Sequence, residues 1–226
     1  MARVLMCPPD YFQINYEINP WMRRSVKSLS RVAHDQWWDL FQLLTEGLGC
    51  IVELIRPQEG LPDLVFTANA GVCCRDIFIP ARFRHAERRG EEAHFRRFFG
   101  ARGYRIVEIA GEVPFEGAGD ALFSGDDLFM GYLFRSDIEA HAAVSAALGV
   151  RALPLMLTDS RFYHLDTCFC PLWNGEVILV YLCDEHVGRA SSHDFRATEF
   201  PEDVEARRLL YNVRKWQLEK ASRPSK

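Results

Sequence analysis

The sequence predicts an α/β fold in which one supersecondary unit repeats along the chain. Short polar motifs recur at nearly constant spacing, pairs of short apolar runs follow them, and helical patterns fill the gaps. The motifs occupy residues 16–20, 66–70, 116–120 and 164–167. They are 50, 51 and 46 residues apart, counted at Asn19, Asn69, Asp120 and Asp166. A period of this length is typical of repeat architectures, and it indicates an enzyme in which the repeats deliver polar side chains to a common centre.

Bulk composition fits one globular domain over residues 1–226. With 226 residues, of which 48% are hydrophobic and 26% charged, the chain can bury a sizeable core. The net charge of -4 argues against nucleic acid as a partner, because phosphate binding needs a clustered positive field. The densest basic stretch, residues 82–97, is interleaved with glutamates and is interpreted as a solvated helix face.

The sequence has no features of a membrane anchor or a secretion signal. No apolar run approaches the ~20 residues needed to cross a bilayer. The first apolar stretch is too short for a signal peptide and meets Pro8-Pro9 at once. The seven cysteines are an odd number without framework spacing, which favours free thiols. We therefore expect a cytoplasmic, reducing environment and no contact with a membrane.

Hairpins are predicted after three of the motifs, because short apolar runs separated by Gly, Asn or Asp turns are hairpin signals. The paired runs are residues 71–74 with 77–79, 121–123 with 128–130, and 167–172 with 177–180. Further strands are predicted at residues 50–55, 105–110 and 152–157.

Helices are predicted between the strands, over residues 34–46, 86–99 and 136–148. The first helix places Trp37 and Trp38 on an apolar face that would pack against the sheets. The second is weakened by Gly90, and the third begins with a capping box that starts at Ser136. No linker interrupts the pattern, but residues 196–226 lack a fifth motif and form an atypical tail.

Three of the motifs together resemble a known enzyme family over residues 1–195. They read Pro-Asp-Leu-Val-Phe-Thr-Ala-Asn-Ala at 62–70, Phe-Glu-Gly-Ala-Gly-Asp at 115–120 and His-Leu-Asp-Thr at 164–167. In this order and spacing they resemble the guanidine-modifying superfamily, also called the amidinotransferase or pentein superfamily. Its members include arginine deiminases, dimethylarginine dimethylaminohydrolases, amidinotransferases and arginine dihydrolases. The resemblance implies a five-bladed α/β propeller of ββαβ units, of which about four are recognisable in this sequence.

The chemistry of this superfamily requires residues of these types. A guanidinium is planar and charged at neutral pH, so carboxylates can hold it through paired, charge-assisted hydrogen bonds. Its carbon is a poor electrophile, and the family attacks it with a cysteine thiolate, which is a strong nucleophile. The departing ammonia is protonated by a general acid. The resemblance therefore implies a small guanidino substrate and no metal or organic cofactor.

By resemblance, His164 is the general acid and base, and Glu116 is the catalytic acid. If residues 164–166 lie on a strand, Asp166 faces the same side as His164. Asp120 either contacts the substrate or is a turn acid bonded to its own backbone. Arg135 either meets a substrate carboxylate or forms a surface salt bridge. The full set of expected substrate contacts is Asp166, Asn69, Asp63, Asn19, Asp120 and Arg135.

Asn69 is the residue that separates the activities within the family. In deiminases and dimethylarginine hydrolases we expect an acid there, whereas asparagine resembles the arginine dihydrolases, which form ornithine, carbon dioxide and two ammonia molecules. The first hydrolysis leaves a neutral ureido group whose oxygen needs a donor, and an amide offers a donor where a carboxylate offers only acceptors. Dimethylarginine hydrolysis, arginine deimination and non-catalytic arginine binding remain the alternatives.

The sequence departs from the family at the nucleophile. The family's cysteine follows a glycine-rich strand in the fifth blade, but no cysteine follows Cys183 here. We therefore expect that about one 50-residue repeat is missing or altered and that the chain as written lacks the nucleophile. Cys168 and Cys170 are interpreted as small apolar strand residues, rather than as a replacement or, with His164, as a zinc site. The open propeller edge would expose unpaired strand groups, so we expect self-association.

Overall fold

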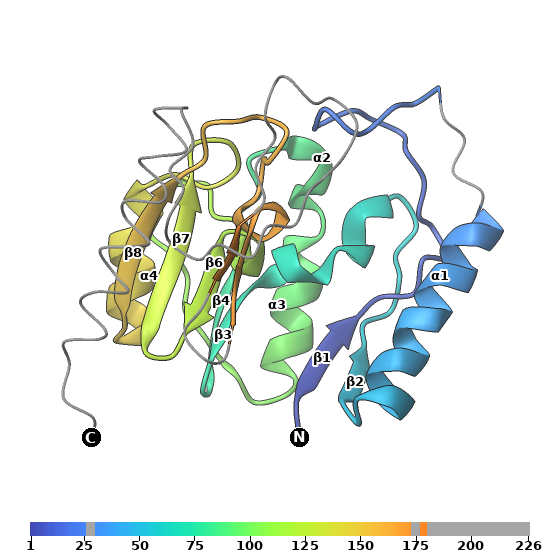
Figure 1. Ribbon diagram of the computed structural model, residues 1–226, viewed down its shortest axis with the longest axis horizontal. Coiled ribbons are helices and arrows are strands. Elements are labelled where there is room, and N and C mark those ends of the chain that lie inside the picture. The colour runs from blue at the N-terminus through green and yellow to red at the C-terminus, as the bar shows by residue number, and fades with distance from the viewer. Residues whose placement is uncertain (26–29, 173–176, 180–226) are drawn as a thin grey trace. The chain divides into compact units, whose positions relative to one another are not determined.

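The computed structural model describes residues 1–25, 30–172 and 177–179. The chain divides into two compact units, residues 1–118 and residues 119–226, and each is described by itself. Figure 1 shows their helices and strands. The turn predicted at residues 173–175 and the atypical tail at residues 196–226 lie outside the described residues.

The first unit contains a three-stranded sheet and two short helices. These elements are β3 (Gly71–Cys74), β4 (Ile77–Pro80), α2 (Ala86–Arg89), α3 (Glu92–Gly100) and β5 (Arg105–Ile106). β3 and β4 form an antiparallel hairpin, and β5 returns after the helices to pair parallel to β4. α3 packs against β4 and β5 (Figure 1). The chain order of the sheet is therefore ββαβ.

The second unit has the same order of elements. They are β6 (Ala121–Ser124), β7 (Asp127–Tyr132), α4 (Glu139–Leu148) and β8 (Arg151–Met156). β6 and β7 form an antiparallel hairpin, and β8 pairs parallel to β7. A further hairpin of β9 (Phe169–Pro171) and β10 (Val177–Leu179) follows. The predicted α/β class is confirmed, and the number of propeller blades stays a prediction.

The N-terminal segment forms a parallel pair of strands joined through a helix. Its elements are β1 (Arg3–Met6), α1 (Ser30–Gln42), the π-helix η1 (Leu43–Gly47) and β2 (Ile51–Leu54). α1 has no buried residue, and Trp38 is 52% exposed, so the prediction that this face packs against the sheets is wrong. The rings of Trp37 and Trp38 instead stack on Phe41, with centroids 5.5 and 5.2 Å away. In the described residues, no helix is long and apolar enough to cross a membrane.

Each unit has its own apolar core. In the first, Phe78 of β4 stacks on Phe99 of α3 with ring centroids 3.8 Å apart, and Cys7 after β1 and Ile55 after β2 join the same cluster. In the second, Phe129 of β7 lies 4.8 Å from Phe169 of β9, measured between ring centroids. These contacts attach the segments that carry the polar motifs to the sheets.

Two predicted elements differ from the structure. The helix predicted at residues 86–99 is broken into α2 and α3, and the break lies at Gly90 and Glu91. Glycine is a poor helix former, and here the side chain of Glu91 is used inside the unit rather than on a solvated face. The strand predicted at residues 105–110 is shorter, because only Arg105–Ile106 pairs with β4.

Candidate active site

Three polar motifs form the same local structure, a short 3-10 helix just before the first strand of a hairpin. The 3-10 helices are η3 (Thr67–Ala70), η4 (Gly117–Gly119) and η5 (Leu165–Thr167). The backbone N of Ala81 donates to Ala70 O at 2.9 Å. The backbone N of Gly131 donates to Asp120 O at 2.8 Å in the same place of the next repeat. Asp120 therefore corresponds to Ala70, and the pairing of Asn69 with Asp120 that the spacing suggested is wrong by one residue.

Glu116 and His164 occupy corresponding positions when residues are counted from the hairpin. Glu116 lies four residues before Asp120, and His164 lies four residues before Cys168, which directly precede β6 and β9. Both side chains are buried, with 0% and 4% exposure. The backbone of His164 is extended, with φ of -126° and ψ of 151°, before the turn of η5 begins. One backbone position thus supplies an acid in one repeat and a histidine in the next.

Charged side chains gather in the interior of the first unit. The buried charged residues described there are Asp63, Arg88, Glu91 and Glu116. Nε and Nη2 of Arg88 donate to the two carboxylate oxygens of Glu91 at 2.9 and 2.8 Å. Nη1 of Arg88 donates to Asn69 Oδ1 at 2.8 Å. Three carboxyl groups and an amide therefore surround one guanidinium.

Burial raises the pKa of Glu91 to about 7. Burial is the largest cause, because it disfavours a charged carboxylate, and the charges of Asp63 and Glu116 act in the same direction. Arg88 opposes this rise. Burial alone would lower the pKa of Arg88, but its hydrogen bond to Glu91 and the surrounding acids raise it, so the guanidinium stays charged.

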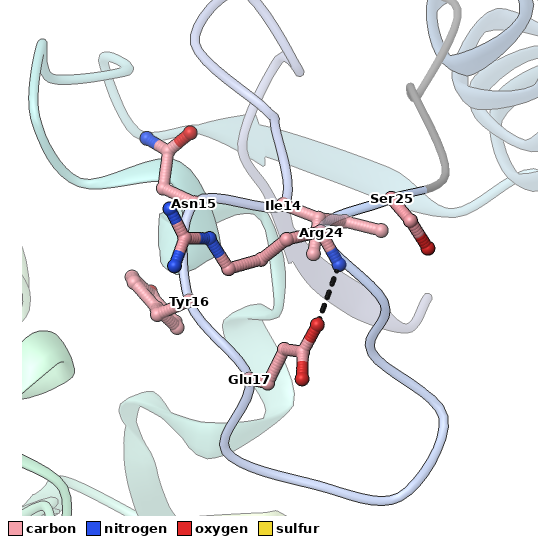
Figure 2. Close-up of a pocket in the computed structure, with 6 residues that line it drawn as sticks. All are labelled: Ile14, Asn15, Tyr16, Glu17, Arg24 and Ser25. Carbon is pink, nitrogen blue, oxygen red and sulfur yellow. Dashed lines mark hydrogen bonds between the residues drawn. The ribbon is translucent and has the colours of Figure 1, made fainter.

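An open pocket lies in the N-terminal loop of the same unit (Figure 2). It has a volume of about 900 Å³ and is lined by Ile14, Asn15, Tyr16, Glu17, Arg24 and Ser25. Glu17 Oε1 accepts a hydrogen bond from the backbone N of Arg24 at 2.8 Å, and the side chain of Arg24 extends across the pocket (Figure 2). The Tyr16 hydroxyl is buried. Burial and then the Asp63 carboxylate raise the pKa of this phenol, so Tyr16 connects the pocket wall with the buried acids.

Asn19 holds the turn of this loop. Its Oδ1 accepts hydrogen bonds from the backbone N of Trp21 at 3.0 Å and from that of Met22 at 3.1 Å. An asparagine bonded to its own backbone in this way fixes a turn. The substrate contact expected for Asn19 stays a prediction, and its amide oxygen already has a local role.

Glu116 is positioned by an isolated β-bridge. Arg82 and Phe115 exchange main-chain hydrogen bonds of 2.7 and 3.0 Å. Glu116 Oε1 then accepts a hydrogen bond from the backbone N of Arg84 at 3.1 Å. The carboxyl group is therefore fixed by the backbone of a distant segment, 32 residues earlier in the chain.

A close approach of two glycines follows directly after Glu116. Gly117 has a φ of 61°, and a Cβ there would lie 2.5 Å from the backbone N of Gly71. Both the positive φ and the contact exclude other residues without a shift of the backbone. Glycine at this place thus sets the position of the preceding acid.

In the second unit, Asp120 organises the segment that carries the histidine. Asp120 is fully buried, and its Oδ2 accepts a hydrogen bond from the Ser136 hydroxyl at 2.6 Å. Oδ2 also lies 3.2 Å from His164 Nδ1, while Oδ1 accepts from the backbone N of Leu165 at 3.0 Å. A carboxylate at this place favours the proton on Nδ1 and leaves Nε2 as the basic nitrogen. The predicted capping box is wrong, because α4 has no side-chain cap and Ser136 binds Asp120 instead.

The sequence predicted that Asp166 and His164 lie on the same strand, and this prediction is wrong. Asp166 lies in η5, where the Thr167 hydroxyl donates to His164 O at 2.6 Å and closes the turn. Asp166 is exposed to solvent. Even so, the surrounding protein raises the pKa of its carboxyl group to about 6. Desolvation is the largest cause of this rise, the charge of His164 acts against it, and Asp120 adds to it.

Cys168 lies beside this turn as a protonated thiol. Its Sγ donates to Leu165 O at 3.6 Å, and its side chain is buried. Burial, followed by the charges of Asp166 and Asp120, raises the pKa of Cys168 to about 12. At neutral pH this residue is therefore a poor nucleophile. Among the described residues, no three His, Cys, Asp or Glu side chains are grouped as ligands of a metal.

Arg135 is buried. Only 3% of it is exposed, and its guanidinium carbon lies 4.8 Å from the ring centroid of Tyr163. A cation over an aromatic face is held by the ring quadrupole. Its expected contact with a substrate carboxylate stays a prediction.

No family model matches the chain. The bifunctional arginine dihydrolase/ornithine cyclodeaminase AgrE of Nostoc sp. is 49% identical over 179 residues, which cover 78% of this chain and 25% of AgrE. The dimethylarginine dimethylaminohydrolase of Mycobacterium tuberculosis is 44% identical over 170 residues, which cover 75% of this chain and 55% of the relative. The chain belongs to the guanidine-modifying, or pentein, superfamily. It spans about a quarter of the length of AgrE and about half that of the mycobacterial relative.

Solved structures of this superfamily share the fold. Unliganded AgrE matches with a TM-score of 0.76 and 48% identity, covering 78% of this chain and 26% of AgrE. The N-terminal domain of the cyanobacterial arginine dihydrolase ArgZ, as a cysteine-to-serine mutant bound to substrate, matches with a TM-score of 0.74 and 44% identity. That match covers 78% of this chain and 66% of the ArgZ domain.

Sequence reasoning missed two residues of this pentein chain, Arg88 and Glu91. Both belong to the basic stretch that was interpreted as a solvated helix face. Only 3% of Arg88 and 0% of Glu91 is exposed to solvent. Gly90 could have indicated their burial from the sequence, because it breaks the helix between Arg88 and Glu91 and allows both side chains to face inward. The interpretation of residues 82–97 as a solvated face is wrong at these two positions.

Proposed function

We propose that this chain acts on the guanidino group of arginine or an arginine derivative, in the manner of an arginine dihydrolase. The observation that carries the proposal is the buried cluster of the first unit, in which Asp63, Glu91 and Glu116 outnumber Arg88. A guanidinium ligand could bind to carboxylates of this cluster through charge-assisted hydrogen bonds. The similarity to arginine-acting relatives supports the same substrate class.

His164 is proposed as the general acid and base of the reaction. Its Nε2 would protonate the departing ammonia and then take a proton from the attacking water. In this proposal Asp120 is a positioning residue, because its carboxylate already contacts Ser136, Leu165 and His164 Nδ1. Asp166, two residues after the histidine, would bind a guanidino nitrogen with the carboxylate that its exposed turn presents.

Asn69 is proposed to allow a second hydrolysis. After the first ammonia leaves, the ureido group is neutral, and an amide can donate to its oxygen as a carboxylate cannot. Water then attacks again, and arginine with two waters gives ornithine, carbon dioxide and two ammonia molecules. An asparagine-to-serine mutant of the N-terminal domain of ArgZ is covalently bound to a reaction intermediate. That observation on a relative supports a role for an asparagine in this chemistry.

The thiolate of the reaction is not assigned to a residue of this chain. Burial raises the pKa of Cys168 to about 12 and that of Cys7 also to about 12, so neither is proposed as the nucleophile. A chain that holds the substrate without a thiolate would bind arginine and release nothing. Non-catalytic arginine binding is therefore the second candidate function.

Product analysis of the full chain tests the proposal. Arginine with 15N in both terminal guanidino nitrogens should yield ornithine and two labelled ammonia molecules. Asn69→Asp should shift the product toward citrulline with one labelled ammonia. Citrulline as the sole product of the unaltered chain would contradict dihydrolase activity. If the chain acts only on dimethylarginine and releases dimethylamine, dimethylarginine hydrolysis would be favoured instead. Binding without any product would support the non-catalytic role.

A further inference from the structure

A chain of three contacts connects Glu91 with Asn69. Glu91 holds Arg88 at two points, through Nε at 2.9 Å and Nη2 at 2.8 Å. Arg88 in turn holds Asn69 Oδ1 through Nη1 at 2.8 Å. All three residues are at least nine-tenths buried. Arg88 and Asn69 are 19 residues apart in the sequence, so this connection exists only in the folded unit.

The contact fixes which way the Asn69 amide faces. A guanidinium has five N–H donors and no acceptor. If the amide were rotated by half a turn, its NH2 group would meet the Arg88 donors and the hydrogen bond would be lost. Arg88 therefore selects the orientation with Oδ1 toward itself and directs the Asn69 NH2 group to the opposite side.

Arg88 can do this only because it is itself held on several sides. Nη2 also donates to Asp63 O at 3.1 Å, and the guanidinium carbon lies 4.3 Å from the ring centroid of Phe83. Glu91 supplies the carboxylate whose two oxygens match the two donors of the guanidinium, which is the strongest geometry for such a pair. Glu91 is in turn anchored at the start of α3, where its carbonyl accepts from the backbone N of His94 at 3.0 Å.

We propose that Glu91 is a positioning residue, which acts through Arg88 to hold the Asn69 amide with its NH2 group directed at the ureido oxygen. This inference rests on the proposed function, because it assigns a partner to the residue on which the second hydrolysis depends. Loss of the Glu91 charge would leave Arg88 without its two-point partner, and the Arg88 donor to Asn69 Oδ1 would no longer be held in place. The first hydrolysis would continue, and the second would be impaired.

The charge of Glu91 depends on its neighbours. Asp63 and Glu116 disfavour its ionised form, Arg88 favours it, and the Tyr16 hydroxyl and Cys7 thiol respond to its charge. The pKa of Glu91 of about 7 means that the ionised form, and with it the two-point contact, is lost as the pH falls from 8 to 6. The orientation of the Asn69 amide should therefore depend on pH in this range.

Side-chain amide NMR on the full chain tests the inference without any need for turnover. The protein is labelled with 15N-asparagine, and the Asn69 signals are identified by their loss in Asn69→Ser. In Glu91→Gln, the Asn69 NH2 protons should shift and exchange with water about tenfold faster, as expected when one charge-assisted hydrogen bond is lost. Unchanged shifts and exchange rates would overturn the inference.

Glu108→Gln is the matched control. Glu108 pairs with Arg96 of α3 at 2.6 Å, but this ion pair is exposed, so its loss should leave the Asn69 signals unchanged. If Glu91→Gln does not fold, Glu91→Asp decides: the shorter carboxylate keeps the charge but cannot reach both Arg88 donors in the same way, so the Asn69 signals should still shift, and unchanged signals would overturn the inference.

A product assay separates this inference from the proposed function. If the unaltered chain forms ornithine, Glu91→Gln should raise the ratio of citrulline to ornithine, whereas a general loss of structure would lower both products equally. An unchanged ratio would overturn the assignment. If the unaltered chain has no activity on arginine, the proposed function fails, and the NMR result alone decides whether Glu91 orients Asn69.

Discussion

The Oδ2 atom of Asp120 lies 3.2 Å from Nδ1 of His164, and the same oxygen accepts the Ser136 hydroxyl at 2.6 Å. Asp120 precedes β6 directly, and His164 precedes η5, so the carboxylate connects two successive repeats inside one unit. The sequence left this acid open as a substrate contact or a turn acid. Its contacts in the structure support a role in holding the histidine and the turn that follows it.

Asp120→Asn should destabilise the second unit. The amide keeps the shape of the carboxylate but loses the charge that accepts from Ser136 and from the backbone N of Leu165. The free energy of unfolding should fall by about 1–3 kcal/mol, measured by urea denaturation. Asp126→Asn in the exposed turn of the same hairpin should change it by less than about 0.5 kcal/mol. Equal effects of the two variants would contradict the role given to Asp120.

Gly117→Ala should be far more damaging than alanine at a glycine with the same backbone angle. Gly117 has a φ of 61° and Gly149 a φ of 65°, but a Cβ at Gly149 would meet no atom within 4 Å. Gly149→Ala should therefore cost about 1–2 kcal/mol, from the left-handed conformation alone. Gly117→Ala adds the clash with Gly71 and should cost roughly 1–3 kcal/mol more. Similar costs from thermal unfolding of both variants would show that the contact with Gly71 is unimportant.

Cys168 should resist alkylation in the native chain. Its thiol is buried and its pKa is raised to about 12, whereas Cys170 is exposed. Treatment with iodoacetamide at pH 8, followed by mass spectrometry of the peptides, should find Cys170 modified well before Cys168. Denatured protein, in which both react, is the control. Rapid alkylation of Cys168 in the folded chain would contradict this prediction and would make Cys168 a candidate nucleophile.

Several features of the site could be predicted from the sequence, because they depend on local patterns. The spacing of the motifs located Asn69, Glu116 and His164, and Gly, Asn and Asp turns located the hairpins that follow. The catalytic roles of Glu116 and His164 follow from the family resemblance and stay predictions, while the structure shows that both side chains are buried.

The remaining features depend on contacts between distant residues. Ser136 stands in a sequence typical of a helix cap. Its hydroxyl instead donates a hydrogen bond to Asp120, 16 residues earlier. Arg88 and Glu91 look like members of a solvated charge run, but their contacts with distant residues such as Asn69 lie inside the unit. Gly90 indicates a helix break between them, but it does not show which residues they contact.

The stability of the second unit should fall in acid because of His141. Burial is the main cause that lowers the pKa of this histidine from 6.5 in the folded state, while Gly131 O, Asp120 and Glu139 act in the other direction. Below pH 6.5 the unfolded chain gains a proton that the folded chain resists, so stability is lost as the pH falls.

Urea denaturation of the unaltered chain and of His141→Gln measures this effect. Between pH 7.5 and pH 5.5, the unaltered chain should lose more stability than the variant. His34→Gln, at an exposed helix position, should behave like the unaltered chain. An equal pH dependence for the unaltered chain and His141→Gln would rule out the effect.

Calorimetric binding of arginine and citrulline to the full chain at pH 8 tests whether the buried acids of the first unit bind a guanidinium. The two ligands have nearly the same shape, but only arginine carries a positive charge that can interact with the buried carboxyl groups of Asp63, Glu91 and Glu116. Arginine should bind at least about tenfold more tightly than citrulline, the difference expected for one charge-assisted hydrogen bond. Equal affinity for the two ligands, or no binding of arginine, would contradict this prediction.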